Sequence, residues 1–186
     1  MPDIVDHRIS GARQLDSPNW NERPGGEISL IVVHGISLPE GHFGNGYVEQ
    51  LFLNRLDAGV HPDFDDLAGV TVSSHLFIAR DGAVSQFVAF DKRAWHAGQS
   101  AFEGRENCND FSIGIELEGT DTSEYREAQY LALANVCDRL LETYGISPRH
   151  IVGHCDIAPG RKTDPGISFD WPRFRKLLNP RWSLTG

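Results

Sequence analysis

Two apolar runs that each lead into a histidine constrain this chain more than any other feature. The strand predicted over residues 28–33 is followed directly by His34, and the one predicted over residues 150–154 ends in His154. A run that is apolar on both faces is typical of a strand at the centre of a covered sheet. Sites in α/β proteins form where such strands end. The sequence therefore predicts that both histidines lie at a sheet edge, although His34 alone could be an ordinary core histidine.

The remaining pattern predicts helices mixed with further strands. Asp81-Gly82 separates two apolar runs, 75–80 and 83–90, which indicates a hairpin. Strict alternation predicts a strand over 111–117. Helices are expected over 47–56, from a cap at Ser123 to about 144 with Gly145 as the stop, and over 169–178, whereas 1–27 and 91–110 read as extended or irregular. We therefore predict an α/β fold, a single domain spanning 1–186 with a core of about 17–178, whose mixed central sheet is flanked by helices.

Charge and cysteine content exclude several classes of protein. The chain has 17 basic and 26 acidic residues and a net charge of −9, which argues against nucleic-acid or membrane partners. Three cysteines are too few for a disulfide framework. The N-terminus shows no apolar signal segment, and no apolar run is long enough to cross a membrane. We expect a cytoplasmic protein, monomeric by default.

A carboxylate ten residues after His154 suggests a metal site. His34, His154 and Asp164 together form the ligand set of a hydrolytic zinc site, with a fourth position open to water. His34 is about 120 residues from His154, so the spacing by itself is weak evidence. Asp164 could instead initiate the turn at Asp-Pro-Gly. The zinc site and the simple turn both remain open at this point.

Glu116 lies on the polar face of the strand predicted over 111–117, next to Gly114 on that face. Glycine leaves room for a close approach, and a carboxylate in such a place suits a general base with a raised pKa. The alternative is a solvated glutamate on an edge strand, which Glu118 two residues later makes plausible.

Two other segments carry reactive side chains. Cys155 follows His154 and could be a thiol nucleophile, but adjacent side chains of a strand point to opposite faces, so packing is the favoured role. Trp95-His96 lies in an irregular segment. An aromatic pair there is either a plug in the core or a platform for a ligand.

Five ordered blocks resemble the AmpD family. They are LIVVH at 30–34, FDKRAWHAG at 90–98, NDFSIGIELEGT at 109–120, GH at 153–154 and IAPGRKTDPG at 157–166. Members of that family are cytoplasmic anhydro-N-acetylmuramyl-L-alanine amidases of the zinc amidase and peptidoglycan-recognition superfamily. The resemblance extends from about residue 17 to 178.

The resemblance implies a function and a role for each matching residue. The family cleaves the amide between anhydro-N-acetylmuramic acid and L-Ala of muropeptides during peptidoglycan recycling, which lowers the muropeptide signal that induces β-lactamase. It implies Zn²⁺ ligands at His34, His154 and Asp164, an acid/base at Glu116, an oxyanion-stabilising cation at Lys162, and substrate contacts at Trp95, His96 and Arg161. Lys92 and Arg93 could add to a cationic cluster for an anionic muropeptide or could be ordinary surface charges.

The chain departs from the family pattern at Gly35, Thr71 and Asn107, where members carry larger polar residues or arginines. These departures affect how the protein binds the sugar and the peptide of its substrate. Three other functions remain to be compared. A non-catalytic peptidoglycan-binding module would lack a metal ligand, a periplasmic amidase would carry a signal peptide or lipobox, and an unrelated zinc peptidase or deacetylase would differ in its products.

Overall fold

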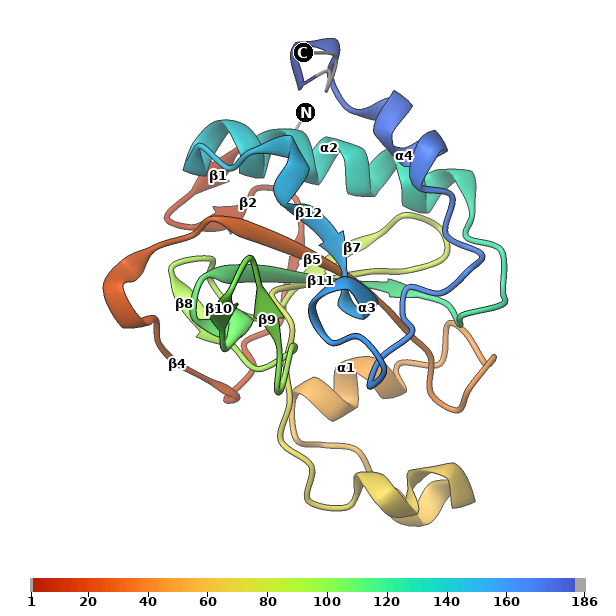
Figure 1. Ribbon diagram of the computed structural model, residues 1–186. Helices are drawn as coiled ribbons and strands as arrows, with labels where there is room; N and C mark the ends of the chain where they lie inside the picture. Colours follow the sequence, from red (N-terminus) through yellow and green to blue (C-terminus); the bar gives the residue numbers. More distant parts are fainter. Residues whose placement is uncertain (1, 183–186) are drawn as a thin grey trace.

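A six-stranded mixed sheet forms the centre of the computed structural model, which describes residues 2–182 (Figure 1). The strand order is β12 (Ile151–Gly153), β5 (Leu30–Ile36), β11 (Ser112–Glu118), β6 (Leu76–Ile78), β7 (Val84–Gln86) and β3 (Arg13–Gln14). The first four strands are parallel, β7 is antiparallel to β6, and β3 is parallel to β7. The predicted mixed sheet and the hairpin at Asp81-Gly82 are confirmed.

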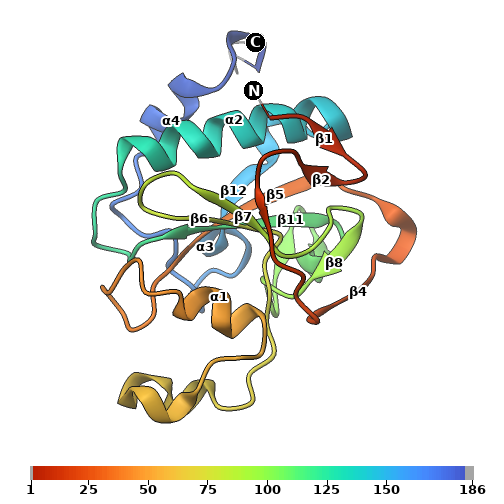
Figure 2. The same ribbon diagram turned by 180° about the vertical axis from the view of Figure 1, so that it is seen from behind.

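Helices cover both faces of this sheet (Figures 1 and 2). On one face lie α2 (Glu127–Tyr144) and α4 (Trp171–Leu177), and on the other lie α1 (Tyr47–Phe52) and the short α3 (His154–Ile157). The apolar stripe of α2, which includes Leu133, Val136 and Leu140, packs in one cluster with Ile31 and Ile113 of the sheet. This packing fixes the central strands, whose other face carries the polar residues.

The paired strands β5 and β11 present two different faces. Ile31, Val33, Ile113 and Ile115 face α2, whereas the alternate residues face the opposite side. In the parallel register His34 lies beside Glu116, so both side chains point to that second side. Glu116 is 7% exposed on a strand with a neighbour on each side, so it is not a solvated edge glutamate.

Some predicted helix boundaries are wrong. Ser123 does not cap α2, because its hydroxyl accepts a hydrogen bond from the backbone N–H of Thr120, and the helix begins at Glu127 after Arg126. Gly145 ends α2 in the left-handed conformation, as predicted. Helix α1 ends at Phe52, before Asn54 takes a positive φ of 56°.

The segments predicted to be extended or irregular contain short elements. The strands are β1 (Ile4–Val5), β2 (Arg8–Ile9), β4 (Trp20–Glu22), β8 (Lys92–Ala94), β9 (Ala101–Phe102) and β10 (Arg105–Glu106). Short 3-10 turns are formed by Pro24–Gly26, Ala58–Val60, Pro62–Leu67, Cys108–Asp110, Pro148–His150 and Pro180–Trp182. The three cysteines carry free thiols. Within residues 2–182, none of the helices has the length and apolarity needed to cross a bilayer.

Candidate active site

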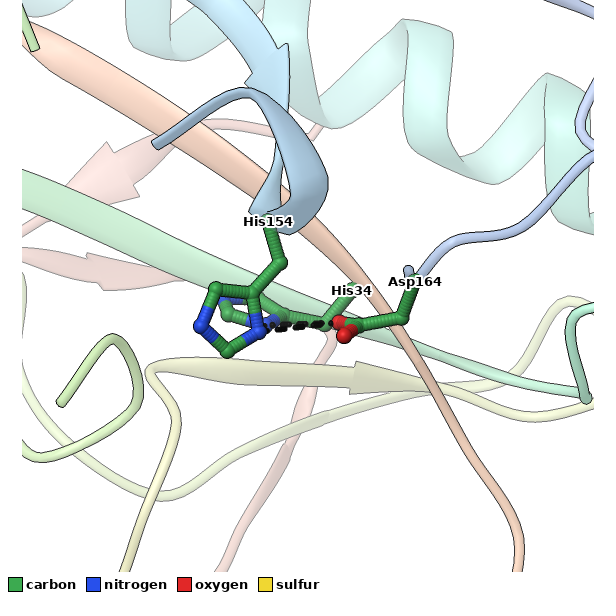
Figure 3. Close-up of side chains that lie close together, drawn as sticks. All are labelled: His34, His154 and Asp164. Atoms are coloured by element: carbon green, nitrogen blue, oxygen red, sulfur yellow. Dashed lines mark hydrogen bonds and ion pairs between the residues drawn. The ribbon is translucent and has the colours of Figure 1, made fainter. Parts of the chain in front are cut away.

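Three predicted ligand residues meet at one end of the sheet (Figure 3). His34 comes from β5, His154 is the first residue of α3 directly after β12, and Asp164 lies on the loop that follows α3. Nδ1 of His34 and Nδ1 of His154 lie 3.0 Å apart. Oδ2 of Asp164 lies 3.2 Å from Nδ1 of His34 and 3.0 Å from Nδ1 of His154. The fold therefore brings residues that are far apart in sequence to a single point.

This donor set fits a divalent metal ion. Zinc binds histidine nitrogen and carboxylate oxygen at about 2.0–2.2 Å in a tetrahedron, which places neighbouring ligand atoms about 3.3–3.6 Å apart. The three atoms here are only slightly closer, and they form a cluster of potential metal ligands. Both histidines are buried and Asp164 is partly buried. Two imidazole nitrogens and a carboxylate oxygen that converge in this way form a set suited to zinc.

The loop that carries Asp164 is tied to the rest of the molecule. The Asp164 carbonyl accepts a hydrogen bond from the backbone N–H of Cys155 at 3.0 Å, and Tyr125 Oη donates to the Pro165 carbonyl at 2.9 Å. Gly35 leaves space for this tyrosine, because a Cβ on it would lie 2.4 Å from Tyr125 Oη and would force the hydroxyl to shift. The small residue at this departure from the family pattern is therefore explained by the tyrosine that occupies the space.

The protonation states of the cluster favour cation binding. Burial lowers the pKa of His34 to about 4, which keeps its ring neutral near pH 7. Burial raises the pKa of the Asp164 carboxyl, but the adjacent rings of His154 and His34 outweigh that effect and hold the pKa below its ordinary value. Metal ligands must be deprotonated, so neutral imidazole and an ionised carboxylate are the required forms.

Glu116 lies beside this cluster. Its Oε1 is 3.9 Å from His34 Nδ1, and it shares a cavity of about 290 Å³ with the three ligand residues. Burial, and next the charge of Asp164, raise the pKa of Glu116 well above its ordinary value, while Lys162 acts in the opposite direction. A raised pKa makes it easier for a carboxyl group to take up a proton, as a general acid/base must.

Three of the four other predicted site residues line the same cavity, and Arg161 lies beside it. Trp95, His96 and Lys162 line it, and Lys162 is exposed. The indole of Trp95 donates to Asn21 Oδ1 at 2.7 Å. Arg161 donates to two main-chain carbonyls, of Ala97 and Gln99, at 2.6 Å each, and lines the neighbouring cavities.

Lys92 and Arg93 do not add free positive charge to a cationic cluster for an anionic muropeptide. Lys92 pairs with Glu22 and Asp91, each at 3.1 Å, and Arg93 pairs with Asp110. These acidic partners neutralise both cations. Lys92 and Arg93 are therefore better interpreted as ordinary surface charges.

Two buried residues beneath the site were missed by the sequence reasoning. The Arg23 guanidinium is buried and donates to the carbonyls of Asn109, Phe90, Lys92 and Ser112. His75 is also buried, and its Nδ1 accepts from the N–H of Gly114 at 3.0 Å. His75 directly precedes an apolar strand, a signal similar to that of His34, whereas no sequence pattern distinguishes Arg23 from a surface arginine.

Comparisons with known proteins agree with this geometry. The family model described as N-acetylmuramoyl-L-alanine amidase matches residues 24–167. The 1,6-anhydro-N-acetylmuramyl-L-alanine amidase AmpD of Citrobacter freundii is 54% identical over 173 residues, with 92% of each chain covered. A crystal structure of a selenomethionine derivative of AmpD superimposes with a TM-score of 0.93 at 51% identity, covering 95% of this chain and 99% of that one.

A more distant solved structure contains a ligand. It is the Escherichia coli amidase AmiD in complex with its substrate, anhydro-N-acetylmuramic acid-L-Ala-D-γ-Glu-L-Lys, with a TM-score of 0.60 and 29% identity over 81% of this chain and 57% of that one. The resemblance to AmpD found in the sequence blocks is thus confirmed. The chain belongs to the N-acetylmuramoyl-L-alanine amidase family, and its AmpD relatives match it over nearly its whole length.

Proposed function

We propose that this enzyme hydrolyses the amide between 1,6-anhydro-N-acetylmuramic acid and the L-Ala of muropeptides. The observation that carries the proposal is the meeting of His34, His154 and Asp164 with Glu116 in one cavity. The complete ligand set argues against a binding module without activity. The similarity to AmpD and the muropeptide in the AmiD complex support the choice of substrate.

Zinc is the proposed metal, held by Nδ1 of His34, Nδ1 of His154 and Oδ2 of Asp164. When bound, zinc supplies Lewis acidity that polarises an amide carbonyl and lowers the pKa of a water molecule. The chain's own residues would orient the substrate and move the protons. Two neutral imidazoles and one carboxylate leave a net positive charge at a loaded site, which suits the negative charge that develops on the substrate oxygen.

Glu116 is the proposed acid/base. Its buried carboxylate would take a proton from the attacking water and pass it to the leaving amine of L-Ala, and its raised pKa favours uptake of that proton. The Lys162 ammonium lies at the cavity wall and would stabilise the developing oxyanion. Trp95 and Arg161 are proposed to border the sugar and peptide on either side.

The proposed cellular role follows from this reaction. The whole chain, residues 1–186, is taken as one catalytic domain that acts in the cytoplasm on recycled peptidoglycan fragments. Cleavage of anhydro-muropeptides would lower the signal that induces β-lactamase in bacteria that carry the inducible enzyme. The proposal requires a muropeptide and no nucleic-acid or membrane partner, with a monomer as the simplest active form.

Mass spectrometry of a purified anhydro-muropeptide after incubation with the zinc-loaded enzyme tests this function. We expect two products, anhydro-N-acetylmuramic acid and the free stem peptide with L-Ala at its N-terminus. Loss of an acetyl group alone would identify a deacetylase, and cleavage within the stem peptide would identify a peptidase. Intact substrate after incubation with a preparation of verified zinc content would contradict the proposal.

A further inference from the structure

The two candidate ligand histidines are oriented by different kinds of partner. His154 Nε2 lies 3.2 Å from the Ala97 carbonyl, which can only accept a hydrogen bond. When Nδ1 of His154 binds the metal, its proton is on Nε2, where this carbonyl accepts it. His34 Nε2 instead lies 2.9 Å from Nδ1 of His96, an imidazole nitrogen that can either donate or accept.

Metal binding selects one direction for the hydrogen bonds that start at His34. If Nδ1 of His34 is a ligand, its proton must be on Nε2, and His96 Nδ1 must accept it. His96 then carries its own proton on Nε2, which lies 3.2 Å from Ser112 Oγ. A serine hydroxyl can accept this bond, so every group from His34 to Ser112 has a suitable partner.

The ring of His96 is held in place by its surroundings. Its plane lies at 88° to that of His34, with the ring centroids 5.0 Å apart. A Cβ on Gly114 would lie 2.4 Å from His96 Cγ, so the ring occupies space that only glycine leaves free. The backbone N–H of His96 donates to Asn109 Oδ1 at 3.1 Å. These contacts fix the position of the acceptor nitrogen.

We propose that His96 is a positioning residue, which holds His34 in the tautomer and ring orientation that present Nδ1 to the metal. The inference rests on the proposed metal site and assigns His96 a role through His34, in place of the substrate contact that the resemblance implied. What the site needs at this point is a hydrogen-bond acceptor. An acceptor other than imidazole at the same position should therefore preserve metal binding.

Zinc dissociation constants, measured by competition with a chromophoric chelator, test this role. The variants are His96→Leu, which removes the acceptor, His96→Asn, whose Oδ1 replaces it, and Ser112→Ala, which removes only the far partner. We expect His96→Leu to weaken zinc binding by about 10–100-fold, the usual effect of losing a partner of a ligand histidine. His96→Asn should bind close to wild type, and Ser112→Ala should lie between the two.

Two further measurements separate this role from general damage to the fold. Unfolding temperatures of the metal-free variants report their stability. If His96 had a purely structural role, the Leu and Asn variants would lose zinc affinity in proportion to their loss of stability. In zinc-loaded wild type labelled with ¹⁵N-histidine, we expect a scalar coupling across the hydrogen bond between His34 Nε2 and His96 Nδ1. Because this coupling is measured in the wild-type protein, it tests the positioning role of His96 even if the Leu variant does not fold.

The outcomes distinguish this inference from the proposed function. Wild-type protein that binds no zinc would overturn both. Wild-type protein that binds zinc, together with a folded His96→Leu variant of equal affinity, would overturn the positioning role alone. A coupling that is absent, with His34 Nε2 unprotonated in the loaded enzyme, would overturn it as well.

Discussion

The two faces of β5 and β11 carry opposite properties although they belong to the same strands. One face holds Ile31, Val33, Ile113 and Ile115, all with 0% exposure, packed with α2. On the other face the pair His34 and Glu116 is also buried, but it borders a cavity and is surrounded by titratable groups. Burial of apolar groups stabilises a fold, whereas burial of unpaired charge opposes it. Alternate residues of these strands thus serve different purposes, one set stabilising the fold and the other forming the candidate site.

The largest effect is expected on the cavity face. Glu116→Gln removes the proposed acid/base and should lower kcat by roughly 10²–10⁴-fold. Zinc content should be unchanged, and the unfolding temperature should not fall because a buried carboxylate is replaced by a neutral group. Steady-state kinetics on an anhydro-muropeptide, with zinc determined in each preparation, measures this. A variant with full zinc and full kcat would refute the role of Glu116.

The adjacent residue on the other face should behave in the opposite way. Ile115→Ala should lower the free energy of unfolding by about 2–5 kcal/mol, because it leaves a cavity against α2. Below the unfolding transition its zinc affinity and kcat should stay near wild type. Urea titration followed by circular dichroism measures the stability. If Ile115→Ala lost activity while still folded, the separation between the two faces would be broken.

Gly114 on the cavity face links the packing of the strand to the position of His96. Gly114→Ala adds a Cβ 2.4 Å from His96 Cγ, so the ring must leave its present position against His34. We expect zinc binding to weaken by about 10–100-fold, in the same direction as the loss of a partner of a ligand histidine. Chelator competition measures it. Equal zinc affinity in a folded Gly114→Ala variant would show that the position of His96 does not matter.

The smallest effect concerns pH and the buried His75. Burial, and next the charge of Arg23, lower the pKa of His75 to about 3 in the folded protein. The unfolded chain titrates near the ordinary value of about 6.5, so it binds more protons than the folded form between these two values. Stability is therefore complete above pH 6.5 and falls as the pH decreases, by about 1.4 kcal/mol per pH unit for one group.

His75→Asn tests this through the slope of stability against pH. Loss of the ring's hydrogen bonds shifts the whole curve, whereas loss of its titration makes the curve flatter between about pH 6.5 and 5. Denaturant titrations of the metal-free proteins at several pH values measure both effects. An unchanged slope in the variant would contradict the buried, neutral state of His75.

The sequence could predict those parts of the site that follow from local patterns. The strands that lead into His34 and His154 were visible as apolar runs, and Asp164 as part of a turn next to the second run. Glu116 stood out because β11 alternates strictly. These signals depend on periods of two and on turn residues, which are set by residues close together in the sequence.

Other features depend on contacts between distant segments and left no such signal. Arg23 is buried only because four carbonyls from other segments converge on it. Ser123 resembled a helix cap, but its hydroxyl is bonded to Thr120 and α2 starts four residues later. His96 was predicted to face substrate, and only the folded chain places its Nδ1 against His34. For Arg23 and His96 these hydrogen bonds join segments far apart in sequence, whereas Ser123 is bonded to a residue only three positions away.

The most direct test of the central claim is anomalous X-ray diffraction from crystals of the zinc-loaded protein, recorded on both sides of the zinc absorption edge. The proposed metal site predicts a single strong peak in the cavity, about 2.0–2.2 Å from Nδ1 of His34, Nδ1 of His154 and an oxygen of Asp164. A peak bonded through Nε2 of His34, or a peak elsewhere with none at these three residues, would contradict it.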